Sequence, residues 1–446
     1  MRILIVGSGG REHALAWKVA GEQRTALLVA APGNPGIAAV ARPVRLDIAD
    51  VEAAAELAER EQIDLTVVGP ELPLDRGIVD LFSSRRLRIF GPSRAAARLE
   101  CSKVFAKAFM ARHGIPTARY RVCDNAEQAH ALVASAELGF PVVVKADGLA
   151  AGKGVTVAAD RLTADAAVAA VMEERQFGDA GSRVVLEECL DGPEVSFFAI
   201  CDGRRAVPLA SAQDHKRVLD EDRGPNTGGM GAFAPSPLVD DAMEARILRE
   251  IVEPVMRGMR EEGHPYIGFL YVGLMLTRDG PKVIEFNARF GDPEAQVVIP
   301  MIDGDLGTVL ASAADGALPD TRLSLLPWKQ VGVVLASREY PRAGSAGLPI
   351  SGVDDACRQP DVLVFHAGTA RDSEARLVTA GGRVLTVVGR GATYEDAIAR
   401  AYAGVSRISF AGMQYRRDIG RKALGIANVA NSSNIATTRH LLRPEC

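Results

Sequence analysis

The sequence has no cysteine spacing that would indicate a disulfide framework, a zinc site or a dithiol redox site. Its six cysteines are scattered along 446 residues, at positions 101, 123, 189, 201, 357 and 446. Scattered cysteines predict reduced thiols that mostly serve packing, as in a cytoplasmic protein.

Long apolar runs are also missing, because none approaches the roughly 18 residues that a membrane-spanning helix needs. The amino-terminal segment begins with the strand-like stretch RILIVG and has no signal-peptide pattern. We therefore expect a soluble, cytoplasmic protein with no membrane partner.

Positive charge is not in excess. The 52 Lys and Arg residues are interspersed with 56 Asp and Glu residues, and the formal net charge is -4. Because a nucleic-acid-binding surface usually concentrates basic residues, we expect no nucleic-acid partner and only a local site for any polyphosphate ligand. The length predicts roughly three domains of about 150 residues each.

A glycine-rich stretch, KADGLAAGKGV from Lys145 to Val155, does not match a P-loop. The P-loop has four residues between its first glycine and its Gly-Lys pair, and then a Ser or Thr that binds Mg²⁺. Here three residues separate Gly148 from Gly152, and Gly154 stands where the hydroxyl would be. The stretch is therefore either another kind of phosphate-binding loop or a plain hairpin.

The stretch VGSGGREH after the first strand is an incomplete dinucleotide fingerprint. Gly7, Gly9 and Gly10 would let a helix N-terminus approach an anion closely. The nicotinamide fingerprint wants a third glycine where Glu12 stands, and an acid near the end of the second strand, which reads VAAPGNPG. The pattern favours a site for a smaller phosphate over a dinucleotide site, and a purely structural tight turn remains possible.

Residues 1–101 alternate strand-like runs with helical segments such as VEAAAELAEREQ. The strand-like runs are RILIVG, ALLVAA, DLTVVGP and RIFGPS. This alternation predicts βαβ units and a Rossmann-like parallel sheet. A helix then starts with Ser102 as N-cap and stops at Gly114 and Pro116, which marks a second region over residues 102–327.

The second region contains an inserted lobe and a long loop. Strands FPVVVKADG, GVTVAAD and RVVLEEC around a helix near residues 163–175 predict a compact α+β lobe at about residues 121–191. The segment from Ser211 to Pro237 is rich in turn formers and has little periodicity. Long structureless loops are uncommon unless they serve a site, so we expect this one to be functional.

Residues 328–424 predict a small, β-rich closing domain. The pattern gives strands QVGVVLAS and VLVFHAGT, a hairpin that turns at Gly381 and Gly382, and a helix capped by Thr393. Residues 425–446 are polar and unpatterned, which predicts an unstructured tail.

Two pairs of polar residues at strand ends suggest ligand chemistry. In KVIEFNARFGD, alternation places Glu285 and Asn287 on one face and Ile284 and Phe286 on the other. A carboxylate beside an amide oxygen is typical of Mg²⁺ sites completed by phosphate oxygens, although such a pair alone is more often a solvated strand face. In VVLEECL, two adjacent glutamates end an apolar strand just before the turn DGPE.

Taken together, these segments resemble the ATP-grasp fold, in which ATP lies between two α+β lobes. The order of further segments is similar to that in the phosphoribosylamine-glycine ligases, also called glycinamide ribonucleotide synthetases, over residues 1–424. The segments are GSGGREHALAWK, APGNPG, VGPELPL, KADGLAAGKGV, DHKR, GPNTGGMGAFAP, GFLYVGLM and EFNARFGDPE. The tail after residue 424 is outside this pattern.

The resemblance implies an ATP site. The glycine-rich stretch would be a mobile hairpin that closes over the phosphates. The residues implied in ATP binding are Lys103, Lys145 and Lys153 at the phosphates, Glu187, Glu188, Cys189 and Leu190 at the adenine hinge, and Glu194 at the ribose. Cys189 and Leu190 would act through their backbone. Glu285 and Asn287 would hold Mg²⁺ or Mn²⁺, but the preceding strand YVGLMLT supplies no further acid.

The resemblance also implies a reaction, in which ATP, glycine and 5-phosphoribosylamine give ADP, phosphate and glycinamide ribonucleotide for purine synthesis. A carboxylate does not accept an amine unaided because oxide is a poor leaving group, so glycine would first become glycyl phosphate. Phosphoryl transfer needs charge neutralisation more than a protein nucleophile. The implied catalytic residues are Arg289, Asp214 and Lys145.

The resemblance also implies residues that contact the substrates. The loop at 224–231, with Asp214, would position glycine and the amine. The implied substrate-binding residues are Gly9, Gly10, Arg11, Glu12, Asn34 and Glu71 for the ribosylamine, with Asp214, Lys216, Gly228, Gly229 and Asp292. His215 and Asp292 could accept a proton, although His215 could equally be a bystander.

Three alternatives stay open. An ATP-grasp ligase for another carboxylate is the nearest, a non-catalytic nucleotide sensor is the second, and a nicotinamide oxidoreductase is the third. Only small molecules are expected as partners, and we expect a monomer.

Overall fold

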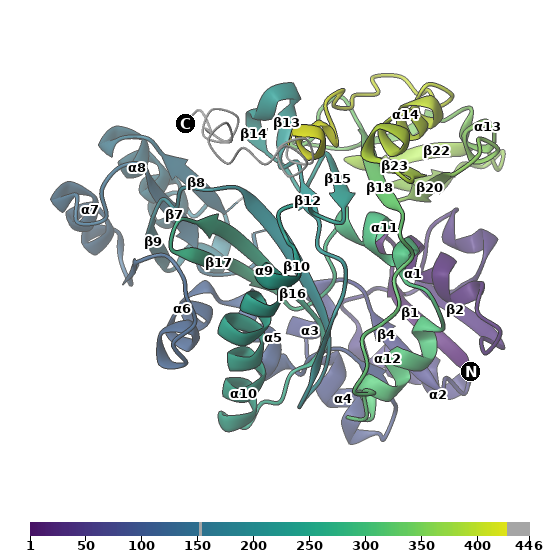
Figure 1. Cartoon of the computed structure of the whole chain (residues 1–446), viewed down its shortest axis with the longest axis horizontal. Helices are drawn as coiled ribbons and strands as arrows, with labels where there is room; N and C mark the ends of the chain where they lie inside the picture. Colours follow the sequence, from purple (N-terminus) through teal and green to yellow (C-terminus); the bar gives the residue numbers. More distant parts are fainter. Residues whose placement is uncertain (151–153, 426–446) are drawn as a thin grey trace.

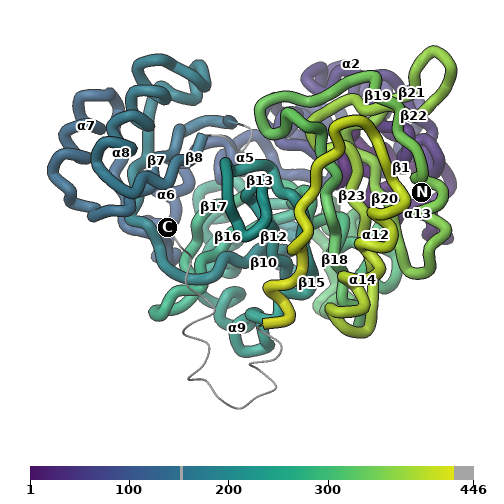
Figure 2. The backbone as a smooth tube through the Cα atoms, turned by 90° about the horizontal axis from the view of Figure 1, so that it is seen from above, coloured from purple at the N-terminus to yellow at the C-terminus, as the bar shows by residue number. Residues whose placement is uncertain are grey.

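The computed structural model describes residues 1–150 and 154–425 (Figure 1). Seen from above in Figure 2, a small lobe with α7 (Ala126–Ser135) and α8 (Arg161–Val168) lies at one end of the molecule. The segments with β1 (Arg2–Gly7) and β20 (Val362–His366) lie together at the other end. No helix in the two described ranges combines the length and apolar character that a bilayer crossing requires.

The N-terminal region is the parallel sheet that the sequence predicts. Its strand order is β3-β2-β1-β4-β5, and every pairing is parallel. The strands are β1 (Arg2–Gly7), β2 (Leu27–Pro32), β3 (Arg42–Pro43), β4 (Leu65–Val68) and β5 (Ile89–Phe90). The helices are α1 (Gly10–Ala20), α2 (Val51–Arg60), α3 (Glu71–Asp75), α4 (Ile78–Ser84) and α5 (Arg94–Cys101).

Both faces of this sheet are buried. Ile3 and Ile5 pack into one apolar cluster, and Leu4 and Val6 pack into another on the opposite side. Helices on both faces explain why the strand sequence is continuously apolar rather than alternating. Of the strands in this sheet, only β3 was not predicted from the sequence, because a strand of two residues is too short to show a hydrophobic pattern.

The central region is an antiparallel sheet of order β11-β10-β16-β17. Its strands are β10 (Glu194–Asp202), β11 (Ala206–Pro208), β16 (Ile267–Thr277) and β17 (Gly280–Asn287). Helices α6 (Lys103–Arg112), α9 (Asp241–Ile247) and α10 (Glu253–Glu261) share an apolar cluster with it. The predicted cap of α6 is confirmed, since the Ser102 side chain accepts a hydrogen bond from the Phe105 amide.

The inserted lobe has its own sheet and core. The strand order is β6-β9-β7-β8, with β6 (Tyr120–Cys123), β7 (Val142–Ala146), β8 (Val155–Ala158) and β9 (Val184–Glu188). Helices α7 (Ala126–Ser135) and α8 (Arg161–Val168) pack on it. Strands β7 and β8 pair antiparallel, so the glycine-rich stretch joins the two strands of a hairpin.

The C-terminal region contains two sheets. The larger has the order β12-β15-β18-β23-β20, and helix α14 (Tyr394–Val405), capped by Thr393 as predicted, packs on it. Its strands are β12 (Gln213–Asp214), β15 (Gly231–Ala234), β18 (Lys329–Ala336), β20 (Val362–His366) and β23 (Arg383–Gly391). The smaller has the order β19-β22-β21, with β19 (Ser345–Pro349), β21 (Thr369–Arg371) and β22 (Leu377–Gly381).

The predicted hairpin at Gly381 and Gly382 is wrong. Strand β22 pairs with β19 and β21, whereas β23 pairs with β18 and β20, so the chain changes sheets between them. Two adjacent strand patterns joined by a short turn are typical of a hairpin, but here each strand pairs with strands of a different sheet, which the local sequence does not encode.

The expectation of a structureless loop from Ser211 to Pro237 is also wrong. Strands β12 and β15 in this segment belong to the larger C-terminal sheet, and β13 (Arg217–Leu219) and β14 (Arg223–Asn226) pair as a separate ribbon. Strands of two to four residues are too short to show a period of two.

Candidate active site

Two side chains with hard oxygen atoms lie side by side at the end of β17. Glu285 and Asn287 are two residues apart in a continuous stretch of pairing with β16, so they project from the same face. Within the described ranges, no group of three Asp, Glu, His or Cys side chains gathers in a way that could hold a metal ion. A cation held by this pair would therefore take most of its ligands from other oxygen atoms.

At Ile284, one residue before Glu285, the predicted alternation of buried and exposed side chains is wrong. The pairing register shifts between Gly273 and Leu274 of β16, so Val283 rather than Ile284 shares the buried cluster with Phe286. The extra residue is a bulge, which a period-two pattern cannot show. The carbonyl oxygen of the bulged residue, Ile284, accepts a hydrogen bond of 3.0 Å from Lys145 Nζ.

Glu187 lies between two buried lysines. Lys145 Nζ is 2.9 Å from Oε1 and Lys107 Nζ is 2.8 Å from Oε2, and all three side chains are at most 5% exposed. Burial lowers the pKa of Lys107 to about 8, although the Glu187 charge opposes this. Sequence reasoning missed Lys107, and the only available signal was its position one turn after Lys103 on α6.

Lys103 lies at the base of the glycine-rich stretch. Its Nζ is 3.4 Å from the Gly148 carbonyl, and burial lowers its pKa while the Glu285 charge opposes this. Asp147 joins the two segments, because its Oδ1 accepts hydrogen bonds from the Ser102 hydroxyl and the Val104 amide. Lys153, expected at the phosphates, lies outside the described residues.

Positive charge surrounds Glu285. Burial raises the pKa of its carboxyl, but the charges of Lys216, Lys145 and Lys103 outweigh this and keep the pKa below its usual value. Lys216 Nζ is 4.0 Å from Glu285 and 2.8 Å from Glu194, the expected ribose ligand. Glu285 is therefore ionised at neutral pH, which is the form that could bind a cation.

Asp214 has the opposite electrostatic environment. Burial raises its pKa to about 7, and the negative charges of Glu294, Glu194 and Glu285 add to this shift although Lys216 opposes it. Glu294 is held by the Ser196 hydroxyl at 3.2 Å. The structure thus brings Asp214, Lys216 and the predicted metal pair into one electrostatic cluster.

Arg289 follows β17 rather than extending it, because the strand ends at Asn287. Its Nε is 3.2 Å from Glu71 Oε2 and its Nη2 is 2.9 Å from Glu100 Oε1. Strand alternation therefore does not set the direction of the Arg289 side chain. Two carboxylates from the N-terminal region orient its guanidinium, and Glu100 was not predicted from the sequence.

The loop after β1 approaches the end of the central region. The Gly9 amide donates to Glu12 Oε2 at 2.5 Å, and the Arg11 amide lies 3.4 Å from Asp292 Oδ2. A Cβ on Gly10 would lie only 2.4 Å from the Gln296 amide nitrogen, so glycine permits this approach. The structure brings Gly9, Gly10, Arg11 and Asp292 together.

The Asn34 side chain connects the N-terminal loops to the C-terminal sheet. Its amide nitrogen donates to the carbonyls of Ser8 and His366, both at 2.8 Å, and its oxygen accepts from the Ile37 amide at 2.9 Å. With the side chain engaged at both ends, Asn34 ties the N-terminal loops to the C-terminal sheet.

Gly228 and Gly229 lie against the C-terminal region. The Gly228 amide donates to the Tyr340 hydroxyl at 2.8 Å, and Arg383 donates to the carbonyls of Gly228 and Asp292, both at 2.5 Å. Burial raises the pKa of the Asp292 carboxyl, but Arg383 and Arg11 outweigh it and hold the pKa low. Asp292 is therefore an anion and a poor proton acceptor at neutral pH.

The remaining predicted residues are divided between the hinge and the C-terminal core. Glu188 ends β9 and binds Arg119 at 2.6 Å, and Cys189 and Leu190 follow in the connection to β10. His215 is 1% exposed, and burial lowers its pKa to about 3, with Lys422 and Arg416 adding to the effect. It is a neutral, buried residue, which favours the bystander interpretation.

The lobe, the central sheet and the charged groups between them define the chain as an ATP-grasp enzyme. A biotin carboxylase domain of the 2-oxoglutarate carboxylase from Hydrogenobacter thermophilus, solved with MgADP, shares this fold at 16% identity, with a TM-score of 0.69 over 97% of this chain and 94% of that one. The ATP-grasp domain model of phosphoribosylglycinamide synthetase matches residues 101–295, and its N and C domain models match residues 1–100 and 330–422. The chain belongs to the phosphoribosylglycinamide synthetase family.

Individual relatives of the chain bear names that agree with this family assignment. A phosphoribosylamine-glycine ligase from Ralstonia nicotianae is 51% identical over 425 residues, which cover 95% of this chain and 100% of the relative. The crystal structure of the phosphoribosylamine-glycine ligase from Thermotoga maritima is 34% identical, with a TM-score of 0.81 over 94% of this chain and 100% of that one. The resemblance inferred from the sequence motifs and the predicted fold class are both confirmed.

Proposed function

We infer that the protein joins glycine to 5-phosphoribosylamine with ATP, giving glycinamide ribonucleotide, ADP and phosphate in purine biosynthesis. The observation that carries this is the match of all three family domains together with a site in which Lys103, Lys145 and Glu285 converge. The nearest alternative is an ATP-grasp ligase for another carboxylate.

ATP would lie between the lobe and the central sheet. Lys103 and Lys145 would bind its phosphates, with Lys153 as a third contact from the glycine-rich stretch. Because the Glu187 carboxylate is buried between two lysines, its contact with adenine would be through the backbone, as for Cys189 and Leu190. Glu194, which is exposed and paired with Lys216, is free to reorient toward the ribose.

Glu285 and Asn287 fit a Mg²⁺ or Mn²⁺ ion, because both offer hard oxygen ligands and the Glu285 carboxyl has a lowered pKa. When bound, such an ion would neutralise charge on the phosphates.

The protein's own groups would then orient the reacting atoms. Arg289, itself held by Glu71 and Glu100, would steady the phosphoryl group as it passes from ATP to the glycine carboxylate. Lys216 and Asp214 would position glycine and the incoming amine. With its pKa near 7, Asp214 can take a proton as the amine attacks glycyl phosphate and phosphate departs.

The ribosylamine would occupy the surface between the N-terminal loop and the C-terminal region. Gly9, Gly10 and Arg11 meet Asp292 there, and the Gly228–Gly229 loop lies beside Arg383. Glu12 stabilises the loop through the Gly9 amide, and Asn34 secures it to the C-terminal sheet.

The deciding experiment follows ADP release with each substrate omitted in turn. We expect ADP only when glycine and freshly generated phosphoribosylamine are both present. ADP release with another carboxylate in place of glycine would favour the alternative ligase, nucleotide binding without turnover would favour a sensor, and AMP as product would overturn the assignment.

A further inference from the structure

Residues 214–216 lie between the active site and the C-terminal region, and their side chains alternate between the two. Lys216 faces the site, 2.8 Å from Glu194. His215, its neighbour in sequence, is 1% exposed and packs edge-on against Phe233 of β15. Whatever holds this segment on the C-terminal side therefore also sets the position of Lys216.

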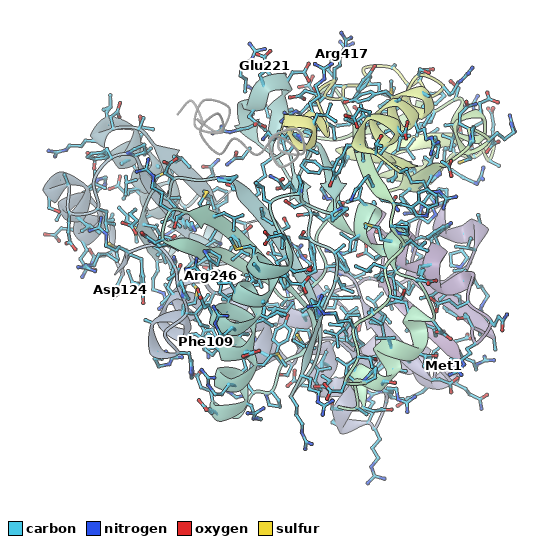
Figure 3. All side chains as sticks on the ribbon, viewed as in Figure 1. Met1, Phe109, Asp124, Glu221, Arg246 and Arg417 are labelled. Atoms are coloured by element: carbon cyan, nitrogen blue, oxygen red, sulfur yellow. The ribbon has the colours of Figure 1, made fainter. Side chains whose placement is uncertain are left out.

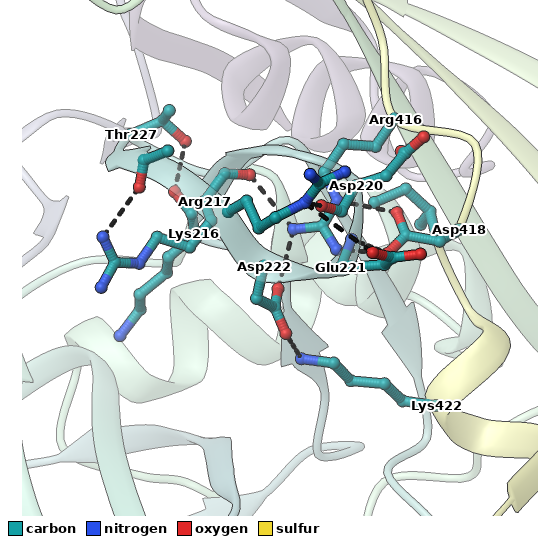
Figure 4. Close-up of polar contacts among 12 residues, drawn as sticks. Lys216, Arg217, Asp220, Glu221, Asp222, Thr227, Arg416, Asp418 and Lys422 are labelled. Atoms are coloured by element: carbon teal, nitrogen blue, oxygen red, sulfur yellow. Dashed lines mark hydrogen bonds and ion pairs between the residues drawn. The ribbon is translucent and has the colours of Figure 1, made fainter. Parts of the chain in front are cut away.

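Arg416 is the principal polar group on that side. Its side chain is fully buried. Nη1 donates to Asp222 Oδ1 at 2.8 Å and to the Arg217 carbonyl at 3.1 Å, while Nε and Nη2 donate to the two oxygens of Asp418 at 2.8 and 2.6 Å (Figure 4). A guanidinium buried this deeply is stable only because several acceptors surround it in a planar arrangement.

Further bonds join the same two segments. The Glu221 amide donates to Asp418 at 2.9 Å, and the Arg417 amide donates to Asp220 at 2.7 Å. In Figure 3, Glu221 and Arg417 are labelled near each other at the top edge of the molecule. The ribbon of β13 and β14 is thus fastened to a C-terminal segment that is distant in sequence.

The ribbon is in turn continuous with the substrate loop. The Lys216 carbonyl accepts from the Thr227 amide at 2.7 Å and from the Thr227 hydroxyl at 2.8 Å. The same hydroxyl accepts from the Gly229 amide at 3.0 Å. These bonds connect Lys216 and the Gly228–Gly229 loop to the ribbon.

We propose that Arg416 is a positioning residue for the ligase reaction. By fixing the 214–229 segment to the C-terminal region, it places Lys216 and the Gly228–Gly229 loop against glycine and the amine. The inference rests on the proposed function, because only that function assigns these residues to the substrates. Arg416 has no expected contact with ATP, whose groups belong to the lobe and the central sheet.

The test compares the full-length parent with Arg416→Gln, Asp222→Asn and the control Arg417→Gln, which changes the exposed neighbouring side chain. Steady-state ADP formation is measured with ATP, glycine and phosphoribosylamine each titrated in turn. In the first two variants we expect kcat/KM for glycine and the amine to fall about ten-fold or more, while KM for ATP, which Lys216 can affect only through Glu194 and Glu285, changes by a smaller factor. The control should match the parent.

Hydrogen exchange provides a second readout. In Arg416→Gln, amides of residues 214–229 should exchange faster, while those of β10 and β16 should not change. If Arg416→Gln fails to fold, Asp222→Asn decides the matter through the same kinetic pattern, because the Asp222 side chain is 40% exposed and its substitution is milder.

Two results would overturn the inference: parental kcat/KM for both substrates in folded variants, or a loss of activity that equals the unfolded fraction and affects all three substrates alike. A parent that forms no ADP from glycine and the amine would instead overturn the proposed function, and this is seen before any variant is compared.

Discussion

Lys107 and Lys145 lie on either side of the Glu187 carboxylate, one ammonium group at each oxygen, at 2.8 and 2.9 Å. Lys107 belongs to α6 beneath the central sheet, whereas Lys145 and Glu187 belong to strands of the lobe. Lys107 also donates to Thr117, whose hydroxyl donates to the Val283 carbonyl of β17. The three charges therefore connect the lobe to the strand that bears Glu285.

Substituting Lys107 should weaken ATP binding although Lys107 is not itself expected to touch ATP. In Lys107→Met, Glu187 keeps only Lys145, which would then be drawn from the phosphates. We expect KM for ATP to rise about ten-fold and the free energy of unfolding to fall by about 1–3 kcal/mol, since a buried ion pair has lost one partner. ADP formation with titrated ATP and urea unfolding measure the two effects.

Lys329→Met, in the C-terminal sheet, is the control and should leave KM for ATP unchanged. A stable Lys107→Met protein with parental KM would show that Lys145 holds its position without Lys107.

Glu285→Ala should reduce turnover by on the order of a hundred-fold or more, because it removes a charged oxygen ligand where phosphate charge must be neutralised. Folding should change little, since Glu285 is only half-buried and Lys145 and Lys216 keep Glu187 and Glu194 as partners. The comparison variant is Asp279→Ala in the exposed turn between β16 and β17. A Glu285→Ala protein that melts far below the parent but keeps its metal-dependent turnover would make the residue structural.

Arg289→Lys keeps the charge but loses the planar guanidinium that Glu71 and Glu100 orient. We expect kcat to fall about ten- to a thousand-fold, the range for one oriented electrostatic donor, with a much smaller change in KM for ATP. The assay is ADP formation at saturating glycine and phosphoribosylamine. Parental kcat would place Arg289 outside the transition state, and Arg338→Lys, at an exposed arginine, controls for the chemical change alone.

Asp214 should make stability depend on pH. Burial raises its folded-state pKa to about 7, whereas the unfolded chain releases this proton near pH 4, so between the two the folded state binds more protons. Stability therefore falls as pH rises through this window. Relative to Asp214→Asn, the parent should lose on the order of 1–3 kcal/mol of unfolding free energy between pH 4 and pH 8.

Urea unfolding of both proteins across this range measures the difference. As a control, the difference between the parent and Asp279→Asn, which changes an exposed carboxyl, should not vary with pH. A constant difference between parent and Asp214→Asn would mean that Asp214 ionises at its ordinary pH in the folded protein.

The sequence by itself determined the elements whose signals are local. The alternation of apolar strands and helices in residues 1–101 predicted the parallel sheet, and Ser102 and Thr393 predicted two helix starts, because burial periodicity and capping are set within one or two turns. The spacing of Glu285 and Asn287 placed both on one face for the same reason.

Tertiary structure decided the rest. The bulge at Ile284, the divergence of β22 and β23 into different sheets, and the short strands after Ser211 all depend on which partner strand is available. The contacts of Glu187 with Lys107 and of Arg416 with Asp222 join residues far apart in sequence. No local pattern encodes them, because a buried charge is stabilised only by the partners that packing brings to it.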